Sequence, residues 1–449
     1  MWTSFLVSSV FMSITAAVLA EICSALPVSG SIYIWAAQAA GRKYGRFIGF
    51  IAAWWIATSW MTSTSTICQV SANYILSLAT VYDLNFPGGI SNDNIKWRVV
   101  VWIVSESLLL LSVLPNYLHS RWYPILFRGA MIIMFLDFML CLIWLPVGVS
   151  KTYGFRSVHD AFLATNNGTG ALPAWNWILS YFFAASACMG FDATGHVAEE
   201  TKNANVVTAR NLFRSCVATS VGGFVTLILF LFCTPNLEKL FSLHAPQPFV
   251  LIYALALGRA GCTFMTCIAT LAALFGGTLI VLATSRLIFA IARDGALPLS
   301  AWISTLTPDG RPKNAVTFVF VFSSVMLCMI IPSSSAFTSL MSAGAIPLAA
   351  CYGLIGLLRL TVTPDAFRSS RFSLGRFRKL FYLTAALFNA LALAVFISPF
   401  TFPVTPSSVN VGGVVFAAVT LMGLASYWFI PETKWLSSER LQVMRNGAD

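Results

Sequence analysis

Apolar residues form long runs along this chain, separated by short stretches that hold most of the Gly, Pro and charged residues. Eleven runs are long enough to cross a membrane as a helix, which takes about 20 residues for a hydrocarbon core of about 30 Å. We expect them at 3–26, 47–76, 97–115, 122–148, 174–197, 211–233, 260–290, 314–331, 337–360, 380–400 and 411–431. The pattern predicts an all-α polytopic membrane protein with a single transmembrane domain at 1–435 and a short cytoplasmic tail at 436–449.

The fifth run is interrupted by polar residues where a crossing helix should continue. Its apolar part, 175–189, is too short to cross the membrane alone, so the crossing must use residues from Gly190 onward. Non-helical backbone at membrane depth is tolerated where protein or a water-filled cavity covers it, and in transporters such breaks present helix ends to a substrate. We therefore expect a break at about 189–193 that points into the protein. Gly190 there either permits the break or packs tightly against another helix.

The residues expected to bind a substrate lie at this break and on the helix at 47–76. They are Gly190, Phe191, Asp192, Ala193, Thr194, Thr58 and Thr62. Two interpretations of Asp192 stay open: its carboxylate contacts a substrate or proton, or it caps the second half of the helix. Thr58 and Thr62 belong to a polar stripe that lines a pathway or bonds neighbouring helices.

Three further carboxylates lie within or near apolar runs, where a charge costs at least about 2.5 kcal/mol on insertion scales. Asp137 and Glu106 are candidates for proton coupling, with a buried structural partner as the alternative. Glu21 lies near the expected inner mouth, where a gate or a loop anchor is the favoured interpretation.

Composition supports the membrane assignment and excludes other classes. Hydrophobic residues make up 58% and charged residues 10% of the chain, and the mean hydropathy is +0.79, whereas soluble proteins carry about 25% charged residues. The net charge of +11 does not indicate nucleic acid, because 21 of the 27 Lys and Arg residues fall in loops expected on the cytoplasmic side. We expect an integral membrane protein in the plasma membrane, with a vacuolar or other internal membrane as the alternative.

The charge count also fixes the expected topology. Eleven spans with a cytoplasmic C-terminus put the N-terminus outside, so we expect a further span upstream of Met1. The loop at 150–173 then lies outside, where Asn167 begins an Asn-Gly-Thr glycosylation acceptor.

Catalytic and metal-binding patterns are missing from the sequence. His196 and Glu199 stand three residues apart, which resembles half of a metal site, but the four histidines are dispersed. No P-loop, dinucleotide-binding glycine pattern or nucleophile elbow is found. We expect neither an enzyme nor a bound metal or cofactor.

Four segments resemble, in order, those of fungal amino acid/choline/GABA permeases of the amino acid–polyamine–organocation (APC) superfamily. They read AEICSALPVSGSIYIWAA at 20–37, GFDATGHVAEET at 190–201, SR with ARDGALP at 285–298, and FPVTP at 402–406. The resemblance implies an inverted-repeat helical bundle of the APC/LeuT type with twelve spans. By this resemblance the sequence begins at the second span, and we expect the family's first span, with its own Gly-rich break, upstream of Met1.

Two functions from different classes follow. The first is a secondary transporter in the lipid bilayer for amino acids or related amines such as GABA or choline, working by alternating access, with protons as the coupling ion implied by the resemblance. The second is a non-transporting remnant or sensor that keeps the permease scaffold. Without a preceding span to supply free helix N-termini, we expect poor transport or none.

Overall fold

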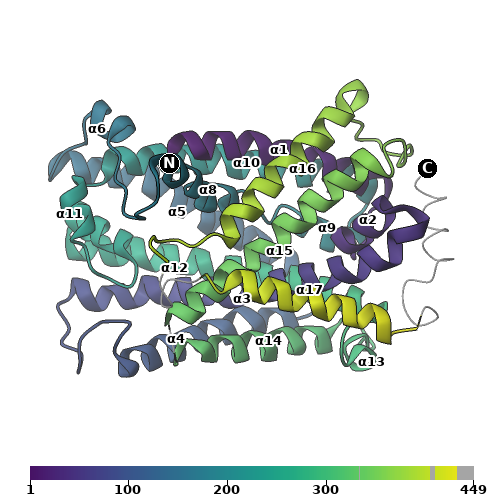
Figure 1. Cartoon of the computed structure of the whole chain (residues 1–449). Helices are drawn as coiled ribbons and strands as arrows, with labels where there is room; N and C mark the ends of the chain where they lie inside the picture. Colours follow the sequence, from purple (N-terminus) through teal and green to yellow (C-terminus); the bar gives the residue numbers. More distant parts are fainter. Residues whose placement is uncertain (333, 405–409, 432–449) are drawn as a thin grey trace.

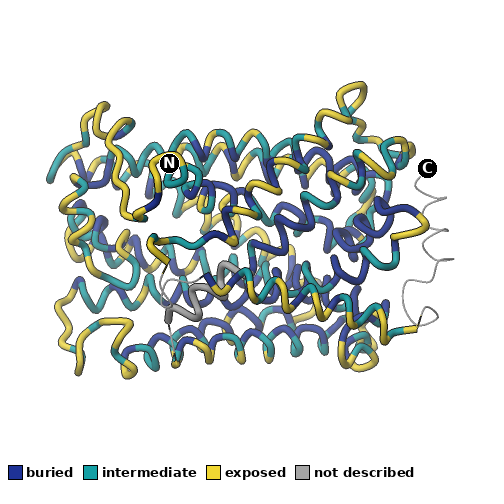
Figure 2. The backbone as a smooth tube through the Cα atoms, viewed as in Figure 1, coloured by how far each residue is buried: buried dark blue, intermediate teal, exposed yellow. Residues whose placement is uncertain are grey.

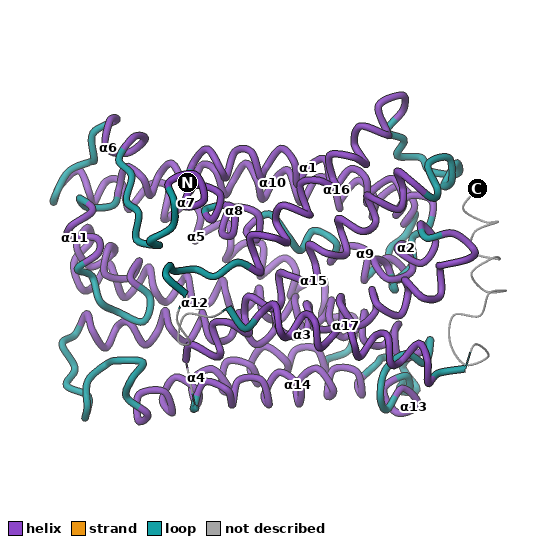
Figure 3. Tube along the Cα trace, viewed as in Figure 1, coloured by secondary structure: helices purple, strands orange, loops and turns teal. Residues whose placement is uncertain are grey.

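The computed structural model describes residues 1–332, 334–404 and 410–431, and every regular element in these ranges is a helix (Figures 1 and 3). The tail expected at 436–449 and part of the turn at 402–406 lie outside the described residues. The α-helices are α1 (Trp2–Ala25), α2 (Ser31–Ala39), α3 (Gly41–Val81), α4 (Ile95–Val113), α5 (Tyr123–Lys151), α6 (Val158–Leu163), α7 (Pro173–Leu179), α8 (Tyr181–Ala187), α9 (Ala193–His196), α10 (Ala204–Cys233), α11 (Leu237–Phe241), α12 (Pro248–Arg293), α13 (Ser300–Ile303), α14 (Lys313–Leu327), α15 (Ser334–Thr361), α16 (Arg378–Ile397) and α17 (Gly412–Phe429).

Nine helices of the described chain are long and apolar enough to cross a membrane. The 41-residue helix α3 is longer than any span needs and carries the polar stripe. The segment 173–196 is divided among α7, α8 and α9. Helix α12 contains a break of its own at Gly258, where φ is 71° and ψ is 179°.

Helix α3 lies at the centre of the bundle. It packs against α2, α4, α12, α14, α15 and α17, and the tube in Figure 2 is most uniformly buried where these helices meet. Peripheral helices such as α5 and α10 have few buried residues, as lipid-facing helices do. The polar stripe is thus held inside the protein, because the most polar of the long helices is the one that other helices surround.

The loops gather at two ends of the bundle. In Figure 1, α2 and α13 lie at one end and α6 and α11 at the other. Three contacts join the four loops at the α2 end: Ser29 N donates to Glu199, Glu199 pairs with Arg293, and Thr363 Oγ1 donates to the carbonyl of Ala39. The expected grouping of the loops at 27–46, 198–210, 291–313 and 361–379 is confirmed. Which end faces the cytoplasm stays a prediction.

A buried ion pair anchors the loop at 361–379. Arg359, 1% exposed in its side chain, lies 3.3 Å from Oε2 of Glu21 on α1. Tyr382 of α16 donates its hydroxyl to the same carboxylate oxygen, and Leu374 N donates to the other oxygen at 3.2 Å. These contacts agree with a loop anchor, the interpretation favoured for Glu21 from the sequence.

We predict that Arg359→Met lowers stability far more than Arg378→Met. The first change leaves the Glu21 carboxylate buried without its cation, which costs about 3–5 kcal/mol. The second removes a partly exposed pair with Asp365, worth about 0–1 kcal/mol. Thermal unfolding of the detergent-solubilised protein measures both, and equal shifts would contradict the structural role of the Glu21 pair.

We also predict that a membrane-impermeant thiol reagent applied from outside labels Asn167→Cys and not Arg371→Cys. The first residue is exposed in the loop before α7 and the second lies in the loop anchored by Glu21. The unsubstituted chain, with its ten cysteines, gives the background. Labelling at 371 alone would invert the assigned orientation.

Candidate functional site

The helical path stops between α8 and α9. Helix α8 ends at Ala187, α9 begins at Ala193, and Gly190 between them has φ +88°. A side chain disfavours that backbone conformation, whereas glycine adopts it freely. A Cβ atom at Gly190 would meet nothing within 4 Å. Glycine is therefore favoured here by the backbone conformation and not by close packing.

Asp192 lies in this gap with its side chain fully buried. Trp60 of α3 donates its indole N–H to Oδ2 at 3.1 Å, and the Tyr352 hydroxyl of α15 donates to Oδ1 at 2.5 Å. The carboxylate makes no capping hydrogen bond to α9. Asp192 therefore connects helices α3 and α15. Its carboxylate oxygens accept hydrogen bonds from these two helices and not from the N-terminus of α9.

His196 completes a second contact with this carboxylate. Its Nε2 lies 3.3 Å from Oδ2 of Asp192, and both side chains are 0% exposed. Its Nδ1 is 2.8 Å from the hydroxyl of Ser31 at the start of α2. Within the described chain His196 is the only ion-pair partner of Asp192, which has no Lys or Arg beside it.

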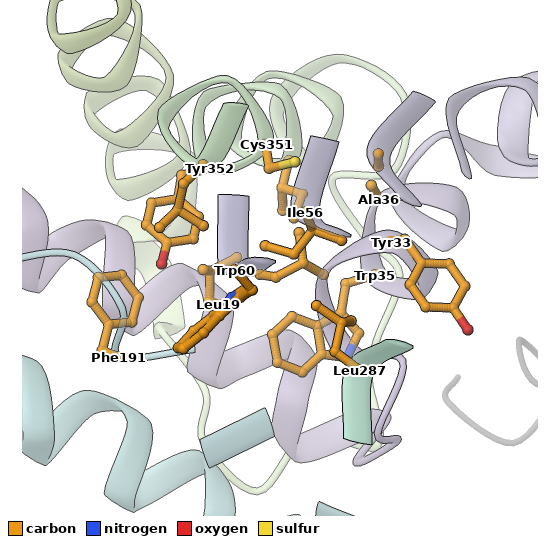
Figure 4. Close-up of a cluster of buried hydrophobic side chains, with 14 of the residues drawn as sticks. Leu19, Tyr33, Trp35, Ala36, Ile56, Trp60, Phe191, Leu287, Cys351 and Tyr352 are labelled. Atoms are coloured by element: carbon orange, nitrogen blue, oxygen red, sulfur yellow. The ribbon is translucent and has the colours of Figure 1, made fainter. Parts of the chain in front are cut away.

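Aromatic rings surround the carboxylate. Phe191 and Tyr352 stack with centroids 5.0 Å apart and planes at 25°, and the Trp60 ring meets His196 edge-on at 5.1 Å. Figure 4 shows Phe191, Tyr352 and Trp60 together on one side of the buried cluster. The carboxylate attracts organic cations by its formal charge, and the faces of aromatic rings attract them by the ring quadrupole.

The three threonines that the sequence predicted at the site differ in their surroundings. Thr194 donates to the carbonyl of Phe191 at 3.1 Å, inside the α9 turn. Thr62 is buried on α3, and its hydroxyl has no hydrogen-bond partner in the described chain, while Thr58 is half-buried. The α3 residue that contacts Asp192 is Trp60, which sequence reasoning missed although the Trp-rich character of this helix was visible.

Tyr352 was missed as well, since nothing marks one tyrosine within the apolar run of α15. Its role depends on two helices meeting, which local sequence does not encode.

The other candidate carboxylates are held elsewhere. Glu106 accepts from Trp102 at 3.1 Å and from Ser324 at 3.0 Å. Asp137 is half-buried on α5, and its Oδ1 has no hydrogen-bond partner in the described chain. None of the hydrogen bonds or ion pairs described for Glu21, Glu106 and Asp137 reaches residues 190–196, so the structure does not bring them to the Asp192 site.

Ion pairs link α12 to the segment that follows α9, at the α2 end of the bundle. Glu199 pairs with Arg293 at 3.2 Å, and Arg286 donates to Glu200 at 2.5 Å. Burial works to raise the pKa of Glu199, but hydrogen bonds from Arg293 and from the N–H of Ser29 outweigh it, so the pKa is lowered. Glu199 thus stays ionised and joins α12 to the turn before α2.

Two remaining predictions concern a metal ion and a glycan. In the described ranges no three His, Cys, Asp or Glu side chains gather as a metal site would require. Asn167 is exposed in the loop before α7, where its glycosylation stays a prediction.

The sequence and the fold of the chain are similar to those of known transport proteins. A family model described as "Amino acid permease" matches residues 1–423. The chain is 40% identical to a thiamine transporter of Schizosaccharomyces pombe, over 97% of this chain and 78% of that one. It is 25% identical to an amino-acid permease of Arabidopsis thaliana, over 93% and 82%. Among solved structures, a manganese transporter of Eremococcus coleocola matches with a TM-score of 0.53 at 14% identity, over 99% and 91% of the two chains, which is a likeness of fold.

We predict that Gly190→Ala destabilises the protein by about 1–2 kcal/mol, the cost of a left-handed conformation for an L-residue. Gly222→Ala is the matched control: its Cβ also meets open space, but it lies within helix α10, where alanine is favoured by about 0.5–1 kcal/mol. Thermal unfolding in detergent compares the two. A Gly190→Ala protein as stable as the parent would mean that the backbone at 190 is not held in this conformation.

Proposed function

Since the chain belongs to the amino acid permease family of the APC superfamily, we propose that it is a secondary active transporter of an amine-bearing or cationic organic solute, working by alternating access around the break at 189–193. The chain is an integral membrane protein with an all-helical inverted-repeat fold and is not an enzyme. Amino acids, GABA and choline were the substrates expected from sequence. The relative named a thiamine transporter adds thiamine, an aromatic cation, to that set.

The observation that carries the proposal is the carboxylate of Asp192. It is fully buried, and its hydrogen-bond donors are the neutral side chains of Trp60 and Tyr352. An ionised carboxylate in a low-dielectric interior costs several kcal/mol unless a cation or strong hydrogen bonds compensate it. A substrate that brings a positive charge supplies that compensation, so the site favours cations over neutral or anionic solutes.

The rings beside Asp192 refine the substrate class. Phe191 and Tyr352 are already parallel and 5.0 Å apart, and a flat ring that displaced one of them would keep a stacked neighbour. Stacking and cation–π attraction act on an aromatic cation together, each worth about 0.5–2 kcal/mol. We therefore place thiamine ahead of choline and of amino acids among the candidate substrates.

Alternating access assigns a role to the α2 end. The pairs Glu199–Arg293 and Glu200–Arg286 join η3 (Ala198–Glu200) to α12, and we propose that they separate when the site opens to the α2 side. The break at Gly190 lets α9 and η3 move relative to α8 without bending a continuous helix. The central helix α3 then acts as the fixed wall against which the site opens.

In contrast to the poor transport expected from the sequence, the family match over residues 1–423 favours a working transporter. We predict that cells expressing the protein take up radiolabelled thiamine, and that Asp192→Asn lowers this uptake by about 10- to 100-fold. The change removes a charge-assisted contact worth about 1.5–3 kcal/mol. Asp83→Asn, which breaks a solvent-exposed pair with Arg259, should leave uptake unchanged. Competition by choline, GABA and alanine ranks the alternatives, with the cations expected to compete best.

Three results would contradict this proposal. One is uptake of none of these solutes by the parent protein. The second is full uptake by Asp192→Asn at normal surface expression, and the third is stronger competition by alanine than by either cation.

A further inference from the structure

We propose that the groove between α1, α10 and α16 binds one anionic phospholipid of the bilayer. One acyl chain lies in the groove, and the phosphate contacts Arg210 and Arg214 at the end of α10 that is nearer to α2. The groove shares no lining residue with the Asp192 site, and the inference does not depend on which solute the protein carries.

The groove opens between three helices on the outside of the bundle. Helix α1 packs against α10 and α16, and Figure 1 shows α1 and α10 side by side along the top of the view. The space between the three helices is about 470 Å³, and nine of its twelve lining residues are apolar. That volume lies within the usual range of about 300–1,000 Å³ for sites that bind small molecules.

The other three lining residues are Ser9, Ser13 and Ser220, and their hydroxyls donate within the protein. Ser9 donates to the carbonyl of Phe5 at 2.8 Å, and Ser13 donates to that of Ser9 at 2.7 Å. Ser220 donates to Sγ of Cys188 at 3.7 Å. Since these hydroxyl hydrogens are already used, the wall of the groove presents a hydrocarbon surface that suits an acyl chain.

The length of the groove matches one leaflet. Helices α1 and α10 run antiparallel, because the rings of Phe5 and Phe224 meet at 6.4 Å and Ser24 donates to the carbonyl of Asn205 at 2.7 Å. On α10 the lining residues fall within 213–225, which is about 18 Å at 1.5 Å per residue. Half of a hydrocarbon core of about 30 Å is of similar depth. The groove therefore has room for one acyl chain of one leaflet.

Two arginines continue the α10 wall of the groove toward the α2 end. Arg210, Arg214, Val217 and Val221 recur at spacings of three and four residues, so they lie on one face of the helix. Both arginines are exposed, and neither has an ion-pair partner within the described chain. An arginine stem lies along apolar surface while its guanidinium binds phosphate bidentately. A lipid phosphate above this groove therefore meets two free guanidinium groups one turn apart.

The loop at 361–379 adds positive charge to the same end. Phe372 in this loop packs against Phe213 of the groove, with ring centroids 5.7 Å apart. The next residue back, Arg371, is exposed, and its N–H donates to Ser24 of α1 at 2.9 Å. The loop thus lies where α1 and α10 meet, beside the end of the groove that carries the arginines.

Acidic residues of this region do not cancel the charge of Arg210 and Arg214. Asp365 pairs with Arg378, and Glu21 is buried against Arg359. The orientation predicted from the charge count puts this end in the cytoplasm, and the cytoplasmic leaflet is the one that carries anionic lipids. Charge therefore favours an anionic headgroup over a zwitterionic one.

The floor of the groove contacts the segment that precedes the break at Gly190. Ser220 is 5% exposed and donates to Sγ of Cys188, and Oγ of Ser9 lies 3.9 Å from the same sulfur. Cys188 directly follows α8. An acyl chain in the groove therefore packs against side chains that hold the end of α8, and its binding should stabilise the folded protein.

A sterol or an apolar helix from a second copy of this chain would also fit an apolar groove. Neither brings an anionic group to Arg210 and Arg214, so neither makes use of these two charges. The dependence of binding on the headgroup charge and on the two arginines separates a phospholipid from both alternatives.

The test is native mass spectrometry of the purified full chain, titrated with dioleoyl phosphatidylserine, with dioleoyl phosphatidylcholine and with cholesterol. The parent should bind the first phosphatidylserine at least about fivefold more tightly than phosphatidylcholine, the effect of about one basic residue near an anionic lipid. Replacing both Arg210→Gln and Arg214→Gln should weaken phosphatidylserine binding by about 30-fold. The matched control replaces Arg42→Gln and Lys43→Gln, which are exposed at the same end of the bundle but on α3, and it should bind as the parent.

A second pair of variants tests the groove itself. Val221 lines the groove and is 61% exposed, whereas Val321 is 53% exposed on α14 and does not line it. Val221→Trp should fill the groove and weaken phosphatidylserine binding by about tenfold, as the loss of two buried methylene groups would. Val321→Trp adds the same ring elsewhere and should not. Saturating phosphatidylserine should raise the thermal unfolding midpoint of the parent and of Val321→Trp, and not that of Val221→Trp.

Three results would overturn the inference. One is equally tight binding of both phospholipids by the parent. Another is phosphatidylserine binding by the double arginine variant as tight as by its control. The third is cholesterol binding, or a dimer of the chain, that Val221→Trp abolishes while phosphatidylserine binding persists. If a variant does not fold, the comparison of the two phospholipids on the parent decides alone. No transport substrate takes part, so the uptake experiments test the proposed function separately.

Discussion

A carboxylate buried among neutral donors is the constraint on which this structure depends. Asp192 is removed from solvent and held by Trp60 and Tyr352, and the cost of keeping such a charge ionised must be met by its surroundings. Position 192 must therefore lie where α3 and α15 both reach it. In a continuous helix through 174–197, the backbone around position 192 would form regular helical hydrogen bonds. In the structure α8 ends at Ala187 and α9 begins at Ala193, and Asp192 in the gap between them contacts α3 and α15.

Much of this arrangement follows from local sequence, and the missing parts are those that depend on tertiary contacts. The apolar run at 175–189 is too short to span, and together with the polar residues after it this predicted the non-helical segment that includes Gly190 and Asp192. The polar stripe indicated that α3 is surrounded by protein. It did not indicate that Trp60, rather than Thr58 or Thr62, contacts the carboxylate. Tyr352 had no sequence signal, because its importance comes from α15 crossing the break some 160 positions away.

The helical bundle itself was predictable, since long apolar runs have few structural solutions in a bilayer. Breaks within helices and the partners of buried polar residues were not predictable. The break at Gly258 within α12 lies near one end of an expected span. A glycine at that place in an apolar run does not by itself indicate a break. Likewise, the charge count placed Glu21 near the expected inner mouth of the protein. It did not indicate its partners Arg359 and Tyr382, which come from α15 and α16. Hydropathy gives the number and length of elements, and contacts between distant elements decide what each polar residue does.

Glu21 and Asp192 show how the same chemical group serves two purposes in one protein. Glu21 faces Arg359, which stays protonated at any physiological pH, so its charge is matched permanently and the contact fixes a loop. Asp192 faces the imidazole of His196, which is not a permanent cation. A permanent partner at Asp192 would leave no place for a substrate cation, and a titratable partner at Glu21 would let the loop loosen with pH. If Asp192 binds the substrate as proposed, the choice of partner, more than the burial of either carboxylate, separates an anchor from a site that binds and releases a ligand.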